Sequence, residues 1–252
     1  MTGPRSLVRA TTGAVGFLTR VPVGHGREEW DAFTDHPGVI PLVGYPVGIA
    51  ISVPLLLHPP LPPSLSAVGF VLVLYLVTGI ANVDGLADFA DGVASHGESD
   101  TVAVMKDTDV GVGGVVGVGL LLVGLYGVGT SLVLLDLTGV GLVIAAEVAS
   151  KLAMATVIAR GTATHEGLGE AVASGAGRWT ITGALVAAAP AALLTWPSPL
   201  AAIVLGLGVV IGVVITWWTD RLIGGINGDV IGAAGEISRL ACLSVGLIGV
   251  SI

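Results

Sequence analysis

Three aspartates at helical spacing are the residues of this sequence best suited to chemistry. Asp84, Asp88 and Asp91 follow one another at intervals of four and three residues, directly after the apolar run from Val68 to Ile80. In a helix, side chains at these intervals share one face. Like charges on one face repel each other unless a cation lies among them. The spacing therefore predicts a divalent metal site that holds a phosphorylated substrate at the membrane surface.

A second polar segment ends the loop that follows these aspartates. It contains Lys106, Asp107 and Asp109 just before the next apolar run. The loop leaves and re-enters the membrane on the same side, so we expect both clusters to converge. Lys106 would then contact phosphate oxygens and Asp107 would complete the metal site. The alternative is a polar helix cap, for which Asp and Thr are well suited.

A glycine-rich segment, Gly224–Glu236, offers a third candidate site. Its glycines allow backbone amides to approach an anion closely. Asp229 and Glu236 are seven residues apart and would share a helix face. The alternative is a flexible turn between two membrane spans.

An acid and a base lie four residues apart inside a long apolar run. Glu147 and Lys151 form this pair. Ionisable residues within a membrane are functional candidates by default. A structural salt bridge between helices explains the pair equally well.

The composition indicates an all-α, polytopic membrane protein with a single domain over residues 1–252. Of the 252 residues, 53% are hydrophobic and 11% are charged, whereas a soluble domain carries about 25% charged residues. The apolar runs are continuous rather than alternating, which argues against a β-barrel. The net charge of −8 disfavours nucleic-acid binding.

We expect six or seven membrane helices and an N-terminal amphipathic helix within residues 1–20. The candidate spans are Val39–Leu57, Leu65–Val83, Val110–Leu135, Gly139–Ala159, Ile181–Trp196, Leu200–Thr219 and Leu240–Ile252. Three short connections, 58–64, 136–138 and 197–199, contain no Lys or Arg. The longer connections hold most of the basic residues, so the positive-inside rule places them in the cytoplasm. The chemistry is therefore expected at the cytoplasmic face of the cell membrane.

Several segments, in matching order, resemble the cobalamin synthase (adenosylcobinamide-GDP ribazoletransferase) family. The resemblance covers most of the chain and rests on Phe17–Val23, Pro41–Gly44, Asp84–Gly92, Met105–Gly111, Glu166–Gly169 and Gly224–Glu236. Three positions depart from the family pattern. Asn82 stands where the family usually has His, Asp109 where it has Arg, and Asn227 where it has Thr.

The resemblance implies an integral-membrane, Mg²⁺-dependent transferase. Such an enzyme joins adenosylcobinamide-GDP to α-ribazole, or to its 5′-phosphate, and releases GMP. Asp84, Asp88 and Asp91 would then be catalytic, with Asp88 or Asp91 accepting a hydroxyl proton. The expected Mg²⁺ ligands are Asp84, Asp88, Asp91, Asp107 and Asp229. The expected substrate contacts are Arg20, Asn82, Lys106, Lys151, Gly225, Asn227, Gly228 and Glu236. The other expected partners are the lipid bilayer and a possible second copy of the chain.

Two other functions fit parts of the sequence. A CDP-alcohol phosphatidyltransferase also places aspartates at the membrane edge, but its signature has Ala-Arg after Asp-Gly, whereas Leu86 and Ala87 follow here. A cation-coupled transporter would suit the glycine-interrupted helices and the Glu147–Lys151 pair. Its carboxylates would be expected at the membrane midplane rather than gathered on one face.

Overall fold

The protein is a bundle of helices. The computed structural model describes residues 3–95, 101–105, 109–164 and 167–251. The helices are α1 (Pro4–Leu18), α2 (Arg27–Asp35), η1 (Pro37–Val39), α3 (Ile40–Ser52), η2 (Val53–Leu57), α4 (Pro63–Thr78), α5 (Ala81–Ala94), α6 (Thr101–Met105), α7 (Val112–Leu132), η3 (Val133–Leu135), α8 (Asp136–Arg160), α9 (Leu168–Ser174), α10 (Thr180–Ala188), η4 (Ala189–Leu193), α11 (Leu200–Leu222) and α12 (Gly228–Ser251). In these ranges, β-type pairing is limited to one isolated bridge, between Ala163 and Ile226. The predicted all-α class is confirmed.

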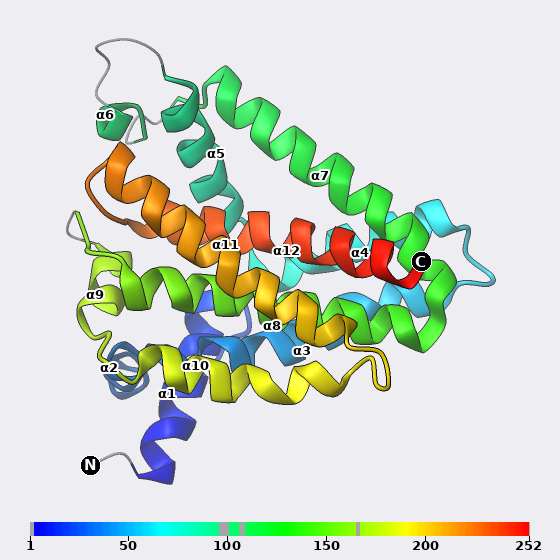
Figure 1. Ribbon diagram of the computed structural model, residues 1–252, viewed down its shortest axis with the longest axis horizontal. Coiled ribbons are helices and arrows are strands. Elements are labelled where there is room, and N and C mark those ends of the chain that lie inside the picture. The colour runs from blue at the N-terminus through cyan, green and yellow to red at the C-terminus, as the bar shows by residue number, and fades with distance from the viewer. Residues whose placement is uncertain (1–2, 96–100, 106–108, 165–166, 252) are drawn as a thin grey trace.

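The helices are long and apolar enough for a multi-pass membrane protein. Four stretches meet the requirement for a span: Pro37–Leu57, Val112–Arg160, Leu200–Leu222 and Gly228–Ser251. Helices α4 and α5 meet it only as a pair, bent by 97°. The stretch Val112–Arg160 holds two of the predicted spans, because the chain reverses at Asp136, where φ is 45°. Figure 1 shows α7 and α8 running in opposite directions.

Three predicted spans differ from the structure. The second was expected to continue to Val83, but α4 ends at Thr78 because Gly79 has a φ of 72° that breaks the helix. The fifth forms only the shorter apolar helix Thr180–Leu193. The last begins at Gly228 rather than at Leu240, so most of the glycine-rich segment is helical and not a turn.

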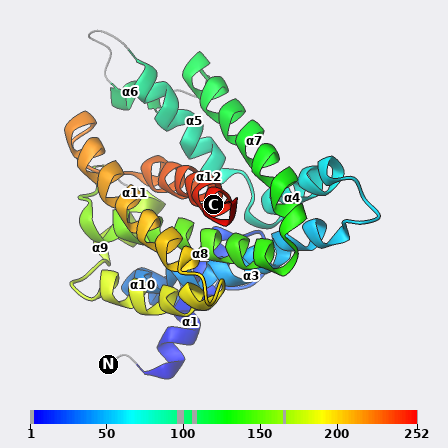
Figure 2. The same ribbon diagram turned by 45° about the vertical axis from the view of Figure 1, so that its right-hand side comes forward.

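Helix α8 lies at the centre of the bundle. Nearly every residue from Gly139 to Ile158 is buried, as is usual for a helix that is apolar on nearly all sides and lies in the core of a large bundle. Figures 1 and 2 show α3, α11 and α12 around it. Small residues permit this close contact. A Cβ added to Gly44 would lie 2.6 Å from the Cα of Val148, and one added to Gly208 would lie 2.5 Å from the carbonyl oxygen of Ala149.

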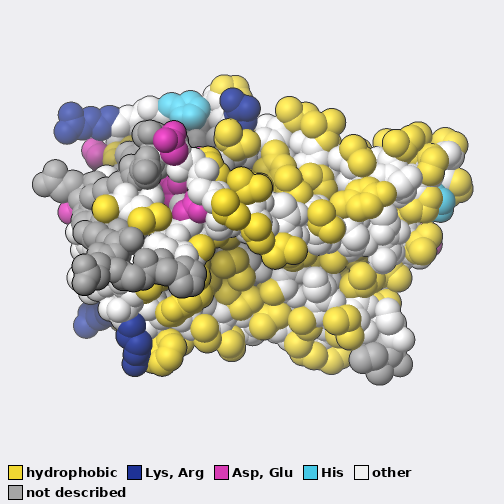
Figure 3. Space-filling model, turned by 90° about the horizontal axis from the view of Figure 1, so that it is seen from above, with side chains coloured by type: hydrophobic (Ala, Val, Ile, Leu, Met, Phe, Trp, Pro, Cys, Tyr) yellow, Lys and Arg dark blue, Asp and Glu magenta, His cyan; other side chains and the backbone are white. Residues whose placement is uncertain are grey.

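The two ends of the bundle differ in charge. The short connections at 58–64, 136–138 and 197–199 lie together at the right-hand end in Figure 1, with the C-terminus. The N-terminus, α2, α6 and α9 lie at the other end. Figure 3 shows Lys, Arg, Asp and Glu side chains gathered at that left-hand end and apolar side chains over the remainder of this face. The arrangement agrees with the predicted alternation of short connections without Lys or Arg and longer connections that hold the basic residues.

Helix α1 is amphipathic, as predicted, and it packs on the bundle. Its buried residues, Ala10, Gly13, Ala14 and Leu18, recur at helical spacing. They contact α2 and α3. Its last turn leads directly to Arg20, whose backbone N–H donates a 2.7 Å hydrogen bond to the carbonyl of Val77 in α4.

Four charged side chains form a closed network inside the bundle. Glu147 and Lys151 of α8, and Glu236 and Arg239 of α12, are all 0% exposed. Lys151 Nζ lies 2.8 Å from Glu147 Oε2. The Arg239 guanidinium pairs with both Glu147 and Glu236. Two acids and two bases therefore cancel, which allows them to stay charged away from water.

The network also reaches α4. The hydroxyl of Tyr75 donates to Glu236 Oε2 at 3.5 Å. The other oxygen, Glu236 Oε1, has no hydrogen-bond partner in the described parts of the chain. Together these contacts join α4, α8 and α12 at one level of the bundle and fix the rotation of α12 about its axis.

Removing one charge from this network should strongly destabilise the protein. Glu147→Gln leaves two buried cations with one anion, and breaking such a network costs about 3–5 kcal/mol. We expect the midpoint of thermal unfolding in detergent to fall by about 10 °C. Glu28→Gln is the matched control, because Glu28 pairs with Arg9 where both side chains are more than half exposed. It should change stability by less than about 1 kcal/mol. Equal effects of the two substitutions would contradict a closed network.

Candidate active site

The helix that carries the three aspartates is positioned by the break after α4. Gly79 supplies the positive φ, and α5 turns away from α4 by 97°. The side chain of Arg20 packs on this glycine, where an added Cβ would lie 3.3 Å from Arg20 Cγ. The N–H of Asp84 donates to the carbonyl of Ile80 at 2.8 Å and begins the new helix. As a result, α5 leaves the direction of the α4 span at the charged end of the bundle.

Helix α5 is held between α7 and α12 by close backbone contacts. A Cβ added to Gly85 would lie 2.8 Å from the Cα of Asp229 in α12. One added to Gly117 of α7 would lie 2.9 Å from the Cβ of Ala90. These contacts on both sides fix the rotation of α5 and bring its aspartates against the start of α12.

Acidic side chains gather where α5 meets α12. Asp84 is exposed, whereas Asp88 and Asp229 are partly buried. Burial and, to a smaller extent, the negative charges of Asp229, Asp84 and Asp91 together raise the pKa of Asp88 to about 6. The start of α12 packs on Gly85 through the backbone of Asp229, so Asp229 lies beside the turn of α5 that carries Asp84 and Asp88. We refer to Asp84, Asp88, Asp91 and Asp229 as the acidic cluster.

Asp91 has a clear structural partner within this cluster. Its two oxygens accept hydrogen bonds from the N–H groups of Gly111, at 2.8 Å, and Gly114, at 2.9 Å. These are the unsatisfied amides at the start of α7, so the carboxylate caps that helix and meets its positive dipole end. An added Cβ at Gly111 or Gly114 would collide with the carboxylate. Asp91 thus attaches α5 to α7.

Asp229 is held in place by the turn before α12. Asn227 Oδ1 accepts from the N–H of Val230 at 3.0 Å, and its Nδ2 donates to Asp229 Oδ2 at 3.0 Å. The turn is itself fixed by Ile226, whose N–H donates to the carbonyl of Thr162 at 2.8 Å and whose carbonyl accepts from the N–H of Thr164 at 3.0 Å. Asn227 therefore both caps α12 and orients an acid of the cluster.

The glycine-rich turn holds two more of the predicted substrate contacts. Gly228 is exposed, whereas Gly225 is buried. Gly225 has a φ of 156°, and a Cβ there would lie 2.1 Å from the carbonyl oxygen of Thr162. A third predicted contact, Asn82, packs against Gly232 of α12. Asn82 thus lies at the junction of α5 and α12, whereas Gly225 packs on the segment that follows α8.

The donors of the acidic cluster suit a hard cation. Carboxylate oxygens are the ligands that Mg²⁺ prefers in proteins, and a cation would relieve the repulsion that raises the pKa of Asp88. The chemical type of these donors therefore suits Mg²⁺, but their spacing does not: within the described ranges, no three acidic, histidine or cysteine side chains are close enough together to hold a metal ion. Lys106 and Asp107, predicted to contribute to the site, lie outside the described residues.

Two predicted substrate contacts lie inside the bundle. Lys151 and Glu236 are 0% exposed and belong to the buried network. Both side chains contact other members of the network, and neither reaches the protein surface, where a substrate would bind. Their position favours the structural alternative for the Glu147–Lys151 pair.

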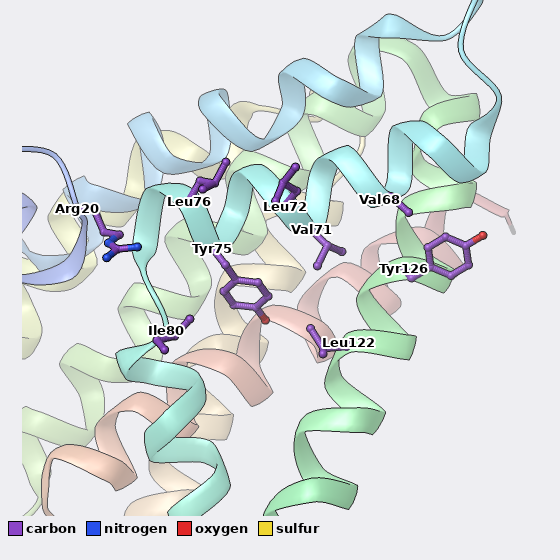
Figure 4. Close-up of a pocket in the computed structure, with 9 residues that line it drawn as sticks. All are labelled: Arg20, Val68, Val71, Leu72, Tyr75, Leu76, Ile80, Leu122 and Tyr126. Carbon is purple, nitrogen blue, oxygen red and sulfur yellow. The ribbon is translucent and has the colours of Figure 1, made fainter.

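Arg20, another predicted substrate contact, lies at the end of an apolar groove. The groove has a volume of about 530 Å³ and runs between α4 and α7. Figure 4 shows Arg20 at one end, the ring of Tyr75 in the middle and Tyr126 at the far end. Ile80, the residue at the start of α5, also lines it. The groove therefore ends one helical turn before Asp84.

Three features of this region were not anticipated. Arg239 completes the buried network, and its position three residues after Glu236 was the available signal. The capping role of Asp91 depends on an α5–α7 contact across twenty residues of sequence. The groove arises from the bend at Gly79, and a hydropathy profile does not predict that bend.

Comparison with known proteins identifies the family of the chain. The family model described as cobalamin-5-phosphate synthase matches residues 10–247. The adenosylcobinamide-GDP ribazoletransferase of Halorubrum lacusprofundi is 40% identical over 96% of this chain and 98% of its own. The protein of the same name from Haloquadratum walsbyi is 38% identical over the same shares, and that of Methanocella arvoryzae is 32% identical over 95% and 96%.

No solved structure matches the chain. The family match spans both halves of the acidic cluster, the buried network and the groove, and the relatives from Halorubrum and Haloquadratum align almost end to end. The chain belongs to the cobalamin-5-phosphate synthase family.

Proposed function

We propose that this protein is an adenosylcobinamide-GDP ribazoletransferase. It joins adenosylcobinamide-GDP to α-ribazole, or to its 5′-phosphate, and releases GMP. The observation that carries the proposal is the acidic cluster, which α5 and α12 build at the charged end of a membrane bundle. The names of its relatives, nearly full-length matches, support the substrate class.

The reaction requires alignment and charge neutralisation. The ribose hydroxyl oxygen attacks the phosphorus on the cobinamide side of the diphosphate, a new P–O bond forms, and the bond to the GMP oxygen breaks. Mg²⁺ held by the acidic cluster would supply charge neutralisation for this displacement. Asp84, Asp88 and Asp229 are its proposed ligands, together with Asp91 and Asp107.

The proton of the attacking hydroxyl needs an acceptor. Of the two candidates, Asp88 and Asp91, Asp88 is the better. Without a metal its pKa is about 6, and a bound cation would lower that pKa, so at neutral pH its carboxylate would be ionised and able to accept a proton. Asp91 is less suited because both of its oxygens already accept backbone N–H groups. Asp88 is also less exposed than Asp84, so a proton held there is shielded from bulk water.

We place the active site on the cytoplasmic face of the cell membrane. The same end as the acidic cluster holds Arg20 and Arg178, in connections, and Arg27 and Arg160, at the ends of α2 and α8. Basic connections stay in the cytoplasm during membrane insertion. The proposed site is then open to soluble substrates.

Neutralising an acid of the cluster should abolish activity. We expect Asp84→Asn and Asp88→Asn each to lower Mg²⁺-dependent GMP release by at least about 100-fold, because a ligand that stabilises transition-state charge is lost. GMP release from membranes given adenosylcobinamide-GDP, α-ribazole and Mg²⁺, with chelator as a blank, measures this. CDP-diacylglycerol as an alternative donor tests the phosphatidyltransferase function.

The matched control is Asp136→Asn. Asp136 is exposed at the opposite end of the bundle, and Asn tolerates its positive φ. This variant should keep wild-type activity. Near-normal GMP release from a membrane-inserted Asp84→Asn protein would refute the metal assignment.

Replacing Asp91 should destabilise the protein, whereas replacing Asp84 should not. Asp91→Ala removes two charge-assisted hydrogen bonds and a helix cap, and we expect a loss of about 1–3 kcal/mol in unfolding free energy. Asp84→Ala removes an exposed like charge from the cluster and should leave stability unchanged or raise it slightly. Thermal unfolding in chelator, without substrates, compares the two. A larger loss for Asp84→Ala would contradict the assigned roles.

Magnesium affinity should depend on pH through Asp88. Its pKa is raised to about 6, so it is neutral below that pH and charged above it. Protons therefore compete with the metal as the pH falls, and the Mg²⁺ concentration for half-maximal GMP release should rise by up to about tenfold per unit below pH 6. Titrations at several values between pH 5 and pH 8 measure it. A half-maximal concentration that stays constant across this range would contradict the assignment.

A further inference from the structure

The groove between α4 and α7 has the shape of a wedge. At one end, α4 and α7 are in tight contact, and a Cβ added to Gly129 would lie 3.1 Å from the Cβ of Ala67. At the other end, α5 turns away from α4 and packs on α7 through Gly117. The gap that opens between them is the 530 Å³ groove, shown in Figure 4.

The lining of the groove is apolar and faces outward. Val68, Leu72 and Leu76 of α4 are 52%, 57% and 60% exposed. On a membrane span, such side chains meet lipid. From the end of α4 at Thr78 back to Val68 is ten residues, about 15 Å of helix. That depth equals half of a hydrocarbon core of about 30 Å, so the groove covers one leaflet.

One cation, Arg20, lies at the mouth of the groove. It is exposed, and its guanidinium has no ion pair or hydrogen bond among the described residues. Its position is nevertheless fixed, by the 2.7 Å hydrogen bond from its backbone N–H to Val77 and by packing on Gly79. This holds the charge at the end of α4, at the level where lipid phosphates lie.

These features are complementary to one kind of molecule. We propose that the groove binds an acyl chain of an anionic phospholipid, from the leaflet at the charged end of the bundle, with the lipid phosphate on Arg20. Apart from Arg20, the polar groups of the lining are the hydroxyls of Tyr75 and Tyr126. A nucleotide would leave its own polar groups unpaired along such walls. The lipid fills the wedge and supports the bend from which α5 starts.

The test is lipid retention by the full chain, measured without substrates. The protein is purified in detergent, exposed to equal amounts of phosphatidylglycerol and phosphatidylcholine, and the bound lipid is counted by mass spectrometry. We expect wild type to retain phosphatidylglycerol preferentially. Arg20→Gln should reduce that preference about fivefold, the effect of one basic residue at an anionic headgroup. Leu72→Trp should block the groove and remove the bound lipid.

Two control variants make the result specific. Arg178→Gln removes an exposed arginine at the same end that stacks on Trp179. Ile203→Trp adds the same bulk at a 51% exposed site on α11. Both should retain phosphatidylglycerol as wild type does, and unfolding midpoints identify any variant that is misfolded.

Two outcomes would overturn the proposal. One is equal retention in Leu72→Trp, Arg20→Gln and the controls. The other is an Arg20→Gln protein with unchanged lipid retention and a raised KM for adenosylcobinamide-GDP, which would assign Arg20 to the substrate. Because retention is measured on the protein alone, neither depends on whether the proposed reaction is correct.

Discussion

The internal charges of this bundle must cancel, and much of the structure depends on how they do so. Glu147, Lys151, Glu236 and Arg239 have no access to solvent, and an unpaired charge there would cost several kcal/mol. Arg239 satisfies both acids at once only when α8 and α12 present these faces to each other. Helix α12 is therefore fixed in rotation as well as in position. Asp229, two turns before Glu236 on the same helix, is placed by that requirement.

A second constraint acts on the other half of the acidic cluster. A run of carboxylates is costly inside a membrane span, and the break at Gly79 separates the helix that carries them, α5, from the apolar α4. Helix α5 turns by 97° and is then enclosed by α7 and α12 through Gly117 and Gly85. The buried network places Asp229 of α12, and the bend at Gly79 places the aspartates of α5. Together they bring acids from two distant segments of the chain to one junction.

Tyr75 connects these two constraints. Its ring lines the groove beside the bend, and its hydroxyl donates to Glu236 in the buried network. An occupant of the groove therefore contacts a residue that contacts the network, and Ile80 in the same wall begins the helix that carries Asp84. The proposed lipid would lie against the elements that position the acidic cluster, which gives the bilayer a direct physical connection to the proposed chemistry.

Composition and spacing alone determined the all-helical membrane fold, the separation of charge between the two ends, and the helical face shared by Asp84, Asp88 and Asp91. These follow from local rules: backbone groups must be satisfied within lipid, and side chains repeat every 3.6 residues. The tertiary structure decided the rest. It ended α4 at Gly79, extended α12 back to Gly228, assigned Lys151 and Glu236 to a buried network, and attached Asp91 to α7. Each depends on a partner far along the chain or on one backbone angle, and neither hydropathy nor spacing encodes which segments will meet.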